Sequence, residues 1–212
     1  MGIEHLGLGL PSPPQEYPSR SIGFGQRAIK ELEGAIGNKD LADVMESLRD
    51  LESRRGAFKK VILFGGSHGG FISATLSGKY PDRFAACILR NPVTDLPSFY
   101  SSTDILDWPF GQLDLEFDLD HPRPPSREQL IQLQEHSPSV YVKNVKIPTL
   151  VLIGERDLRV SPFPGRAWYT WLRSQGVTTK MLVFPDAGHS LDTAVSEKNS
   201  LLAINEFLAS VG

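Results

Sequence analysis

A serine in a glycine-dense turn is the residue best suited to chemistry in this sequence. Ser67 lies in the stretch Gly65-Gly66-Ser67-His68-Gly69-Gly70, in which Gly65 and Gly69 flank it in the pattern Gly-x-Ser-x-Gly. Small neighbours allow the backbone to turn sharply and allow a substrate to approach the hydroxyl group. Such a serine attacks a carbonyl group when a histidine accepts its proton and an acid orients that histidine. The rest of the chain must therefore supply an acid and a histidine.

Asp157 and His189 are the predicted partners of Ser67. Each of the three residues follows an apolar run that is typical of a buried strand, at 61–64, 149–154 and 181–184 respectively. Side chains that follow parallel strands collect at one edge of the sheet, where ligands bind. The order serine, acid, histidine is the order required on a sheet where such a serine turn connects a strand to a helix. The residue after the serine, His68, would donate its backbone N–H to the developing oxyanion.

Each assignment has a plainer alternative. A glycine-rich turn after a strand is often only a turn, or it binds a phosphate group. Asp157 is also compatible with a solvated loop acid or with an ion pair to Arg159, and Glu155 competes for the role of the acid. No two of the five histidines have the spacing of a zinc site, so we expect neither a metal nor another cofactor.

The elements that must position these residues alternate between helices and apolar strands. Buried strands are predicted at 61–64, 84–89, 149–154 and 181–184. Helices are predicted from about residue 40 to 51, after the serine turn to about 78, from 126 to 133, through 168–172, and from 191 to the C-terminus. This alternation is typical of right-handed crossovers on a parallel sheet. We therefore predict an α/β fold, with a mostly parallel sheet flanked by helices.

Local signals mark several helix ends. Asn38 and Asp40 suit the cap and the dipole of the first helix, and the residues from Ser126 to Gln129 form a capping box. Gly176 has the position of a C′ glycine. We expect the apolar side chains of the closing helix to face the core, namely Leu201, Leu202, Ile204, Phe207 and Leu208.

The segment 91–125 lacks a sustained period and is predicted to be a long irregular region. Connections of that length are usually functional or disordered. It contains the aromatic residues Trp108, Phe110 and Phe117. These side chains suit either the wall of a substrate pocket or plain packing over the core.

Composition favours a single globular domain without nucleic-acid or membrane partners. The 212 residues suffice for one sizeable core, and a net charge of -3 gives no electrostatic basis for binding nucleic acid or an anionic membrane. No apolar stretch is long enough to cross a bilayer, and the N-terminus lacks the layout of a signal peptide. The lone cysteine, Cys87, lies in an apolar run and indicates a buried thiol in a reducing compartment. We therefore expect a cytoplasmic location.

Several motifs resemble the acylaminoacyl-peptidase branch of the prolyl oligopeptidase family of serine peptidases. Besides the stretch from Gly65 to Phe71, they are Gly23-Phe24-Gly25-Gln26, Arg90-Asn91-Pro92-Val93, the segment 102–108, the segment 137–142 and Asp157-Leu158-Arg159-Val160. The resemblance implies an α/β-hydrolase fold and a serine peptidase that removes N-acylated residues from blocked peptides. It also implies a cytoplasmic location and assembly into homo-oligomers.

The chain departs from that family at its N-terminal end. Family members carry a β-propeller and the first strands of the hydrolase sheet, where a His-Gly-Gly-Pro motif supplies the second oxyanion donor. Residues 1–20 match neither part and are rich in proline and glycine. Ser161 also stands where the family usually has proline. We therefore predict an irregular leader over residues 1–20 and a partial hydrolase domain, truncated at its N-terminal strands, over residues 21–212.

Two functions remain open at this stage. The intact motifs favour a serine peptidase, with a small carboxylesterase as the alternative within the enzyme class. The absent strands favour a catalytically weak or inactive fragment that acts as an interaction partner, for example on a full-length homologue, because an exposed apolar sheet edge invites association. Loss of one oxyanion donor would lower turnover by about a hundredfold to a thousandfold.

Overall fold

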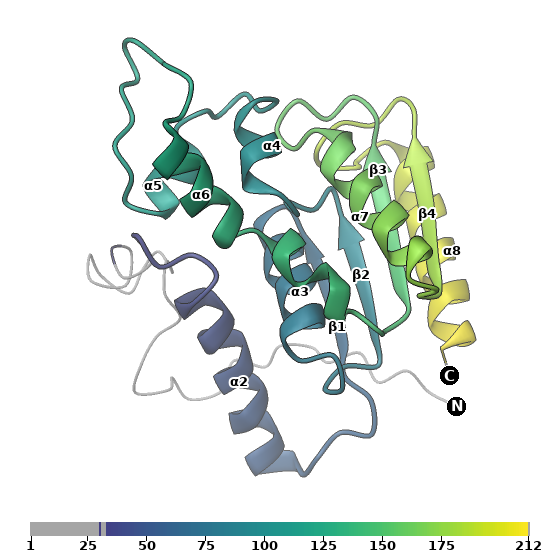
Figure 1. Cartoon of the computed structure of the whole chain (residues 1–212). Helices are drawn as coiled ribbons and strands as arrows, with labels where there is room; N and C mark the ends of the chain where they lie inside the picture. Colours follow the sequence, from purple (N-terminus) through teal and green to yellow (C-terminus); the bar gives the residue numbers. More distant parts are fainter. Residues whose placement is uncertain (1–29, 31–32, 212) are drawn as a thin grey trace.

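The computed structural model describes residue 30 and residues 33–211, and a parallel sheet organises this part of the chain (Figure 1). Its strands lie side by side in chain order, as β1 (Ile62–Gly66), β2 (Ala86–Arg90), β3 (Thr149–Gly154) and β4 (Thr179–Phe184). Each strand pairs with the next in a parallel register. Strands that are buried on both faces appear in a sequence as continuous apolar runs, which explains why these four were recognisable. The predicted α/β fold with a parallel sheet is confirmed.

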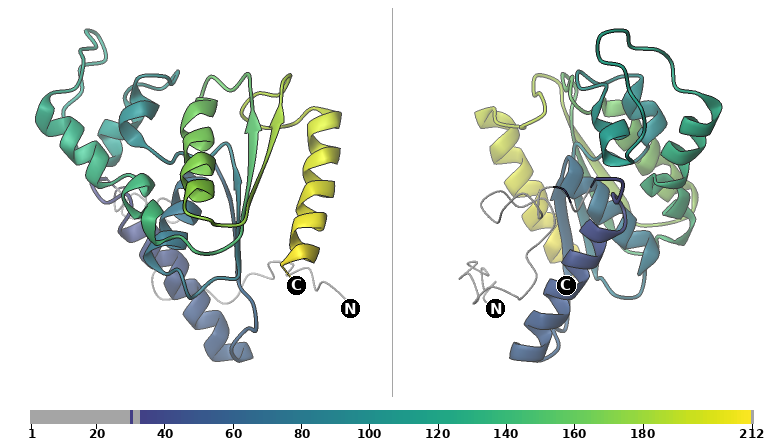
Figure 2. Two further views of the ribbon diagram at one scale, coloured as in Figure 1. Left: turned by 45° about the vertical axis from the view of Figure 1, so that its right-hand side comes forward. Right: turned by 90° about the vertical axis from the view of Figure 1, so that its left-hand side faces the viewer.

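Helices cover the two faces of the sheet (Figure 2). On one face, α3 (His68–Lys79) and α7 (Pro162–Ser174) pack over alternate strand residues such as Cys87 and Val151, and α2 (Lys39–Arg55) lies outside α3. On the other face, α8 (Ala194–Ser210) packs over residues such as Ile88 and Leu152. Successive strand residues point to opposite faces, so each strand contributes to both cores.

Cys87 is fully buried in the first of these cores. Burial raises the pKa of its thiol far above the ordinary value, because the thiolate would lose its hydration. The thiol is therefore protonated and inert, as the sequence predicted.

The segment 91–125 contains more regular structure than predicted. It forms two short helices, α4 (Leu96–Tyr100) and α5 (Trp108–Gln112), before α6 (Arg127–Glu135) and the 3₁₀-helix η1 (Pro138–Asn144). The prediction of an irregular region was wrong at these two helices, because one turn of helix is too short to show a period. Buried side chains from this segment form a further apolar cluster beyond the strand ends, with Leu96, Phe99 and Phe110 among its members.

Two other predictions about helices need correction. Asn38 precedes α2 but makes no side-chain capping hydrogen bond. Leu201 and Leu202 are 63% and 50% exposed, whereas Phe207 of the same helix is buried. The capping box of Ser126 and the left-handed glycine at position 176 are confirmed. The predicted leader over residues 1–20 and the Gly23–Gln26 motif lie outside the described residues.

Strand β1 forms one edge of the described sheet and leaves apolar side chains exposed. Ile62 is 40% and Phe64 is 56% exposed, whereas their register partners Ala86 and Ile88 are buried. Helix α8 covers the neighbouring strands on that face. No helix of the described part of the chain is long and apolar enough to cross a membrane.

Candidate active site

Ser67 occupies a strained turn between β1 and α3. Its φ of 56° and ψ of -122° lie outside the regions that side-chain-bearing residues ordinarily adopt. A methyl group on Gly65 would lie 2.0 Å from the carbonyl oxygen of Gly69, and one on Gly70 would lie 2.8 Å from Pro92. A methyl group on Gly69 would meet nothing within 4 Å. The crowding that requires glycine therefore lies at Gly65 and Gly70.

The backbone around Ser67 also fixes the start of α3. The N–H of Ser67 donates to the carbonyl of Arg90 at 3.0 Å, which ties the turn to the end of β2. His68 is the first residue of α3, so its own N–H has no partner within the helix. The sequence prediction that this N–H serves the oxyanion is compatible with that position.

Asp157 and His189 are brought together at the ends of β3 and β4. The Nδ1 of His189 lies 2.7 Å from Oδ2 of Asp157, whose side chain is fully buried. The other oxygen of Asp157 accepts the backbone N–H groups of Arg159 and Val160, both at 2.9 Å. A carboxylate only accepts hydrogen bonds, so Nδ1 carries the proton and Nε2 is left to accept another. This is the orientation that a histidine needs to act as a general base.

Ser67 lies at the same edge of the sheet, where β1 ends. Among the residues that the structure describes, no hydrogen bond joins His189 to Ser67. Such bonds are often long in enzymes without substrate and shorten in the complex. The complete triad therefore stays a prediction, of which the structure shows the Asp157–His189 half.

The side-chain contacts of Glu155 and Asp157 show which of these two acids faces His189. Glu155 forms an ion pair with Arg166 of α7 rather than a contact with His189. The guanidinium of Arg159 forms an ion pair with Asp104 and not with the carboxylate of Asp157. The hydrogen bond from Arg159 holds the pKa of Asp104 below its usual value. Asp157 is thus the acid that faces the histidine.

Asn91 belongs to the candidate site through its hydrogen bonds, whereas the sequence analysis named it only as part of a family motif. Its side chain is buried at the end of β2, where Nδ2 donates to the carbonyls of Gly188 and His189 at 3.3 and 2.9 Å. Its Oδ1 accepts the N–H of Gly154 at 2.8 Å. These bonds fasten the histidine loop to the end of β3. A polar residue directly after a buried strand was the available signal.

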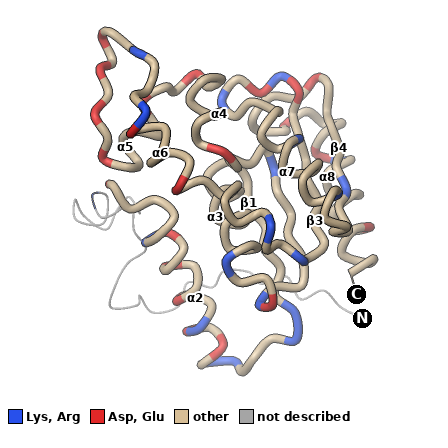
Figure 3. The backbone as a smooth tube through the Cα atoms, in the orientation of Figure 1, with Lys and Arg blue, Asp and Glu red and all other residues tan. Residues whose placement is uncertain are grey.

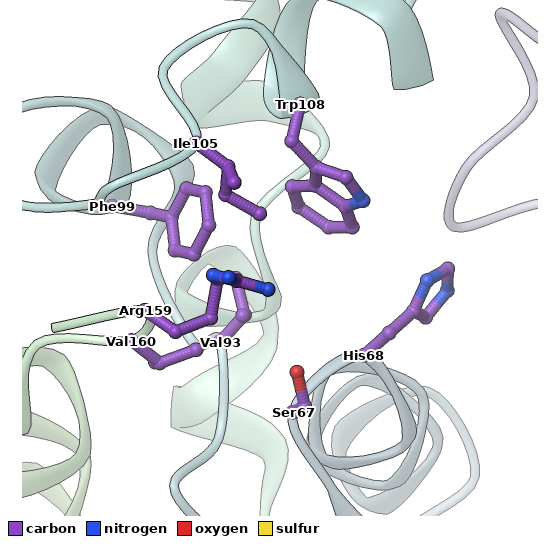
Figure 4. A pocket seen from close by; sticks show the side chains of 8 residues that line it. All are labelled: Ser67, His68, Val93, Phe99, Ile105, Trp108, Arg159 and Val160. Carbon is purple, nitrogen blue, oxygen red and sulfur yellow. The ribbon is translucent and has the colours of Figure 1, made fainter. Parts of the chain in front are cut away.

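A cavity of about 200 Å³ opens beside Ser67 (Figure 4). Apolar side chains line most of it, namely Val93, Phe99, Ile105, Trp108 and Val160. Its polar lining comes from Ser67, His68 and Arg159. Of the aromatic residues considered for a pocket wall, Trp108 lines this cavity, whereas Phe110 and Phe117 stack on each other at 4.8 Å.

The side chain of His68 is held by Asp40, a contact that the sequence did not predict. The Nε2 of His68 lies 2.9 Å from Oδ2 of Asp40, in the first turn of α2. Asp40 is buried, at 6% exposure. The carboxylate of Asp40 therefore binds a side chain of α3, in addition to any interaction with the dipole of α2.

Comparison with known proteins relates the chain to one family. A model described as the prolyl oligopeptidase family matches residues 21–211. The acylamino-acid-releasing enzyme of Rattus norvegicus is 35% identical over 183 residues, which are 86% of this chain and 25% of that protein. Acylamino-acid-releasing enzyme 1 of Oryza sativa subsp. japonica is 38% identical over 187 residues, 87% of this chain and 24% of that protein. The chain thus spans about a quarter of the length of these relatives.

Solved structures show the same fold. An acylaminoacyl peptidase of Pyrococcus horikoshii has a TM-score of 0.70 and 21% identity, over 81% of this chain and 27% of its own. A puromycin-hydrolyzing peptidase of Mycobacterium tuberculosis has a TM-score of 0.78 and 23% identity, over 90% and 28%. At this identity the likeness supports the fold alone. With these neighbours, the partial α/β-hydrolase architecture that the sequence predicted is confirmed.

Proposed function

The chain belongs to the prolyl oligopeptidase family, and on that premise we propose that it is a serine peptidase. In this proposal Ser67 is the nucleophile, His189 the general base and Asp157 the acid that orients it. The observation that carries the proposal is the 2.7 Å contact between His189 and Asp157 at the sheet edge where Ser67 turns. An aspartate with these hydrogen bonds holds the histidine in the tautomer that can take a proton from serine.

The chemistry follows from these roles. The Oγ of Ser67 attacks the substrate carbonyl while Nε2 of His189 takes the hydroxyl proton, and the amine leaves with that proton. Water, activated by the same histidine, then hydrolyses the acyl-serine ester. The free N–H of His68 at the start of α3 stabilises the oxyanion in both steps. Gly65 allows the turn, and the small residue Gly69 leaves room for the substrate to approach.

We propose N-acylated residues of blocked peptides as the substrates. Curated relatives in two kingdoms carry the name acylamino-acid-releasing enzyme. The apolar cavity beside Ser67 suits the side chain of the residue whose carbonyl is attacked. The proposal includes a cytoplasmic location, an irregular leader over residues 1–20 and a partial catalytic domain over residues 21–212.

The exposed edge strand favours a second candidate function. Ile62 and Phe64 on β1 are exposed apolar side chains on a strand with no partner on its outer side among the described residues. Such an edge favours association with another chain, either a homo-oligomer or a full-length homologue. In that case the chain would be an interaction partner with weak or no catalysis. A small carboxylesterase is the alternative within the enzyme class.

The test is labelling of folded, monodisperse protein with a fluorophosphonate probe, with Ser67→Ala as the control. We expect labelling that depends on Ser67, because the probe reacts with an activated serine. Folded protein that stays unlabelled would favour the interaction partner. If labelling occurs, the rates on an acetylated aminoacyl amide and on a short-chain ester distinguish a peptidase from an esterase.

A further inference from the structure

A second aspartate–histidine pair lies beside Ser67 and has no part in the proton transfers described above. His68 and Asp40 are 28 residues apart, and their side chains meet at 2.9 Å. The second oxygen of Asp40 accepts the N–H of Leu41, also at 2.9 Å. A buried carboxylate is costly unless it is hydrogen-bonded or paired. The carboxylate of Asp40 is satisfied in this way, which makes the pair a built feature rather than a chance contact between surface groups.

The pair fixes which nitrogen of His68 faces outward from the carboxylate. Because a carboxylate only accepts, the proton of the imidazole lies on Nε2, and in the neutral ring Nδ1 is an acceptor. Phe71 and Trp108 contact the ring edge to face, with centroids at 5.6 and 5.7 Å, and restrict its rotation. Within the described part of the chain, Nδ1 has no hydrogen-bond partner.

His68 lines the same cavity as Ser67, and its ring lies at the side of the cavity, to the right of Ser67 and below Trp108 in the view of Figure 4. Most of the lining is apolar, and the guanidinium of Arg159 is engaged by Asp104. A substrate residue with its side chain in this cavity and its carbonyl at Ser67 carries an N–H on the same α-carbon. That N–H needs an acceptor, and among the side chains that line the cavity Nδ1 of His68 is one that no hydrogen bond of the described residues uses. A few placed polar groups in an apolar pocket commonly fix the orientation of a ligand.

We propose that Nδ1 of His68, held in its tautomer by Asp40, accepts the N–H of the substrate residue on the acyl side of the scissile bond. The inference rests on the proposed function, because attack by Ser67 places the substrate. It assigns the site a preference for an acylated amino acid over the corresponding acylated hydroxy acid, in which an oxygen replaces the N–H. Loss of one such hydrogen bond corresponds to about a tenfold loss of affinity.

Binding to the Ser67→Ala variant tests the proposal without requiring turnover. The probes are an N-acetyl amino acid amide with an apolar side chain and its 2-acetoxy analogue, and their Kd values are measured by calorimetry. We expect the first probe to bind about tenfold more tightly. Adding His68→Phe, which keeps an aromatic ring in the cavity wall, should remove this preference. The matched control His121→Phe changes an exposed histidine outside the cavity and should retain it.

A second variant guards against misfolding of the first. Asp40→Asn leaves His68 in place but no longer fixes its tautomer, because an amide can donate as well as accept. We expect the preference to fall to about a third of its original value, within the tenfold range set by one hydrogen bond. Circular dichroism confirms the fold of each variant.

The outcomes separate the subsite from the proposed function. Equal weakening of both probes by His68→Phe, an unchanged preference, or no binding of either probe to the Ser67→Ala chain would each overturn the subsite. Failure of the unsubstituted chain to label with a fluorophosphonate would overturn the peptidase proposal instead. A retained preference for the N–H probe in that unlabelled chain would still support the subsite.

Discussion

Two aspartate–histidine pairs lie at the end of the molecule that carries Ser67, and the same two residue types have different roles in the functions that we propose for them. Asp157 binds Nδ1 of His189, whereas Asp40 binds Nε2 of His68. The first choice leaves Nε2 at the tip of the ring, where it can reach a hydroxyl group. The second leaves Nδ1 near the backbone, where it can reach a group in the adjacent cavity. The comparison teaches that the bonded nitrogen, and not the pairing itself, decides what the histidine can do.

The two pairs also differ in how the protein holds them. Asp157 and His189 lie on loops that follow strands, and Asp157 accepts two backbone N–H groups besides the imidazole. Asp40 and His68 lie in the first turns of α2 and α3, and Asp40 accepts one backbone N–H. The additional donor fixes the orientation of the Asp157 carboxylate more firmly than that of Asp40.

Replacing the two aspartates by asparagine, one at a time, should give the largest difference in the rate of fluorophosphonate labelling. Asp157→Asn should lower the rate of fluorophosphonate labelling by about 10⁴-fold, because His189 loses the tautomer that accepts the serine proton. Asp40→Asn should lower the rate by about tenfold or less, since Ser67 and His189 keep their own partners. A time course of labelling at one pH measures the rate of each variant relative to that of the unsubstituted chain. Similar losses in both would show that the two pairs form one network.

The sequence predicted the pair of Asp157 and His189, because these residues could be placed from local patterns. Strand β3 was predicted at its observed bounds because its short apolar run follows Pro148 and ends at Gly154, which favours a buried strand over a helix. Asp157 and His189 followed from their positions after strands. The contacts of Asn91 with the histidine loop and of Asp40 with His68 were missed because no motif or known triad order relates these residues, so only the fold reveals that they meet.

Helices were predicted less well than strands, for a related reason. Helices α4 and α5 have five residues each, which is little more than one turn and gives no repeat to detect. In α8, apolar residues occur on several sides, so periodicity did not identify Leu201 and Leu202 as exposed. The competition between Glu155 and Asp157 likewise needed the position of a third residue, Arg166 on α7.

The next largest effect is a change in stability, which we expect from substitutions in the turn that holds Ser67. Gly65→Ala would place a methyl group 2.0 Å from a carbonyl oxygen, and the required shift should cost about 3 kcal/mol of stability. Gly69→Ala meets open space in α3 and should raise stability by up to about 1 kcal/mol, because alanine favours a helix. Urea unfolding measures both. Equal destabilisation would mean that Gly69 is also required by the backbone.

A substitution of Asn91 should affect the pair of Asp157 and His189 but not the pair of Asp40 and His68, because Asn91 bonds to the loop of His189 and the end of β3. Asn91→Ala removes its hydrogen bonds to Gly154, Gly188 and His189 and should cost about 2 kcal/mol of stability. We expect the labelling rate to fall about tenfold as His189 loses its fixed position, while the binding preference attributed to His68 stays unchanged. Calorimetry on the Ser67→Ala background provides the second measurement. A loss of that preference would contradict the independence of the pairs.

The smallest effect on stability is expected for the exposed pair of Asp104 and Arg159, in contrast to the two pairs in which the aspartate is buried. The hydrogen bond from Arg159 lowers the pKa of Asp104 in the folded chain below its ordinary value of 3.8. A lowered folded-state pKa contributes stability that is present above the ordinary value and is lost as the pH falls through the folded value. The Tm difference between the chain and Asp104→Asn should therefore be small at pH 7, decrease as the pH falls below 3.8, and decrease in high salt.

Two hydrogen bonds that carry no charge lie next to the ion pair of Asp104 and Arg159. The N–H of Asp104 donates to the carbonyl of Leu158, and the hydroxyl of Thr103 donates to the carbonyl of Arg159. These bonds join the cavity wall to the loop that carries Asp157, and they do not titrate. Asp104→Asn keeps both bonds, so a Tm difference that persists at pH 2 and in high salt would not come from charge and would contradict this prediction. Loss of the difference under both conditions would assign it to charge, as expected for an ion pair that water surrounds.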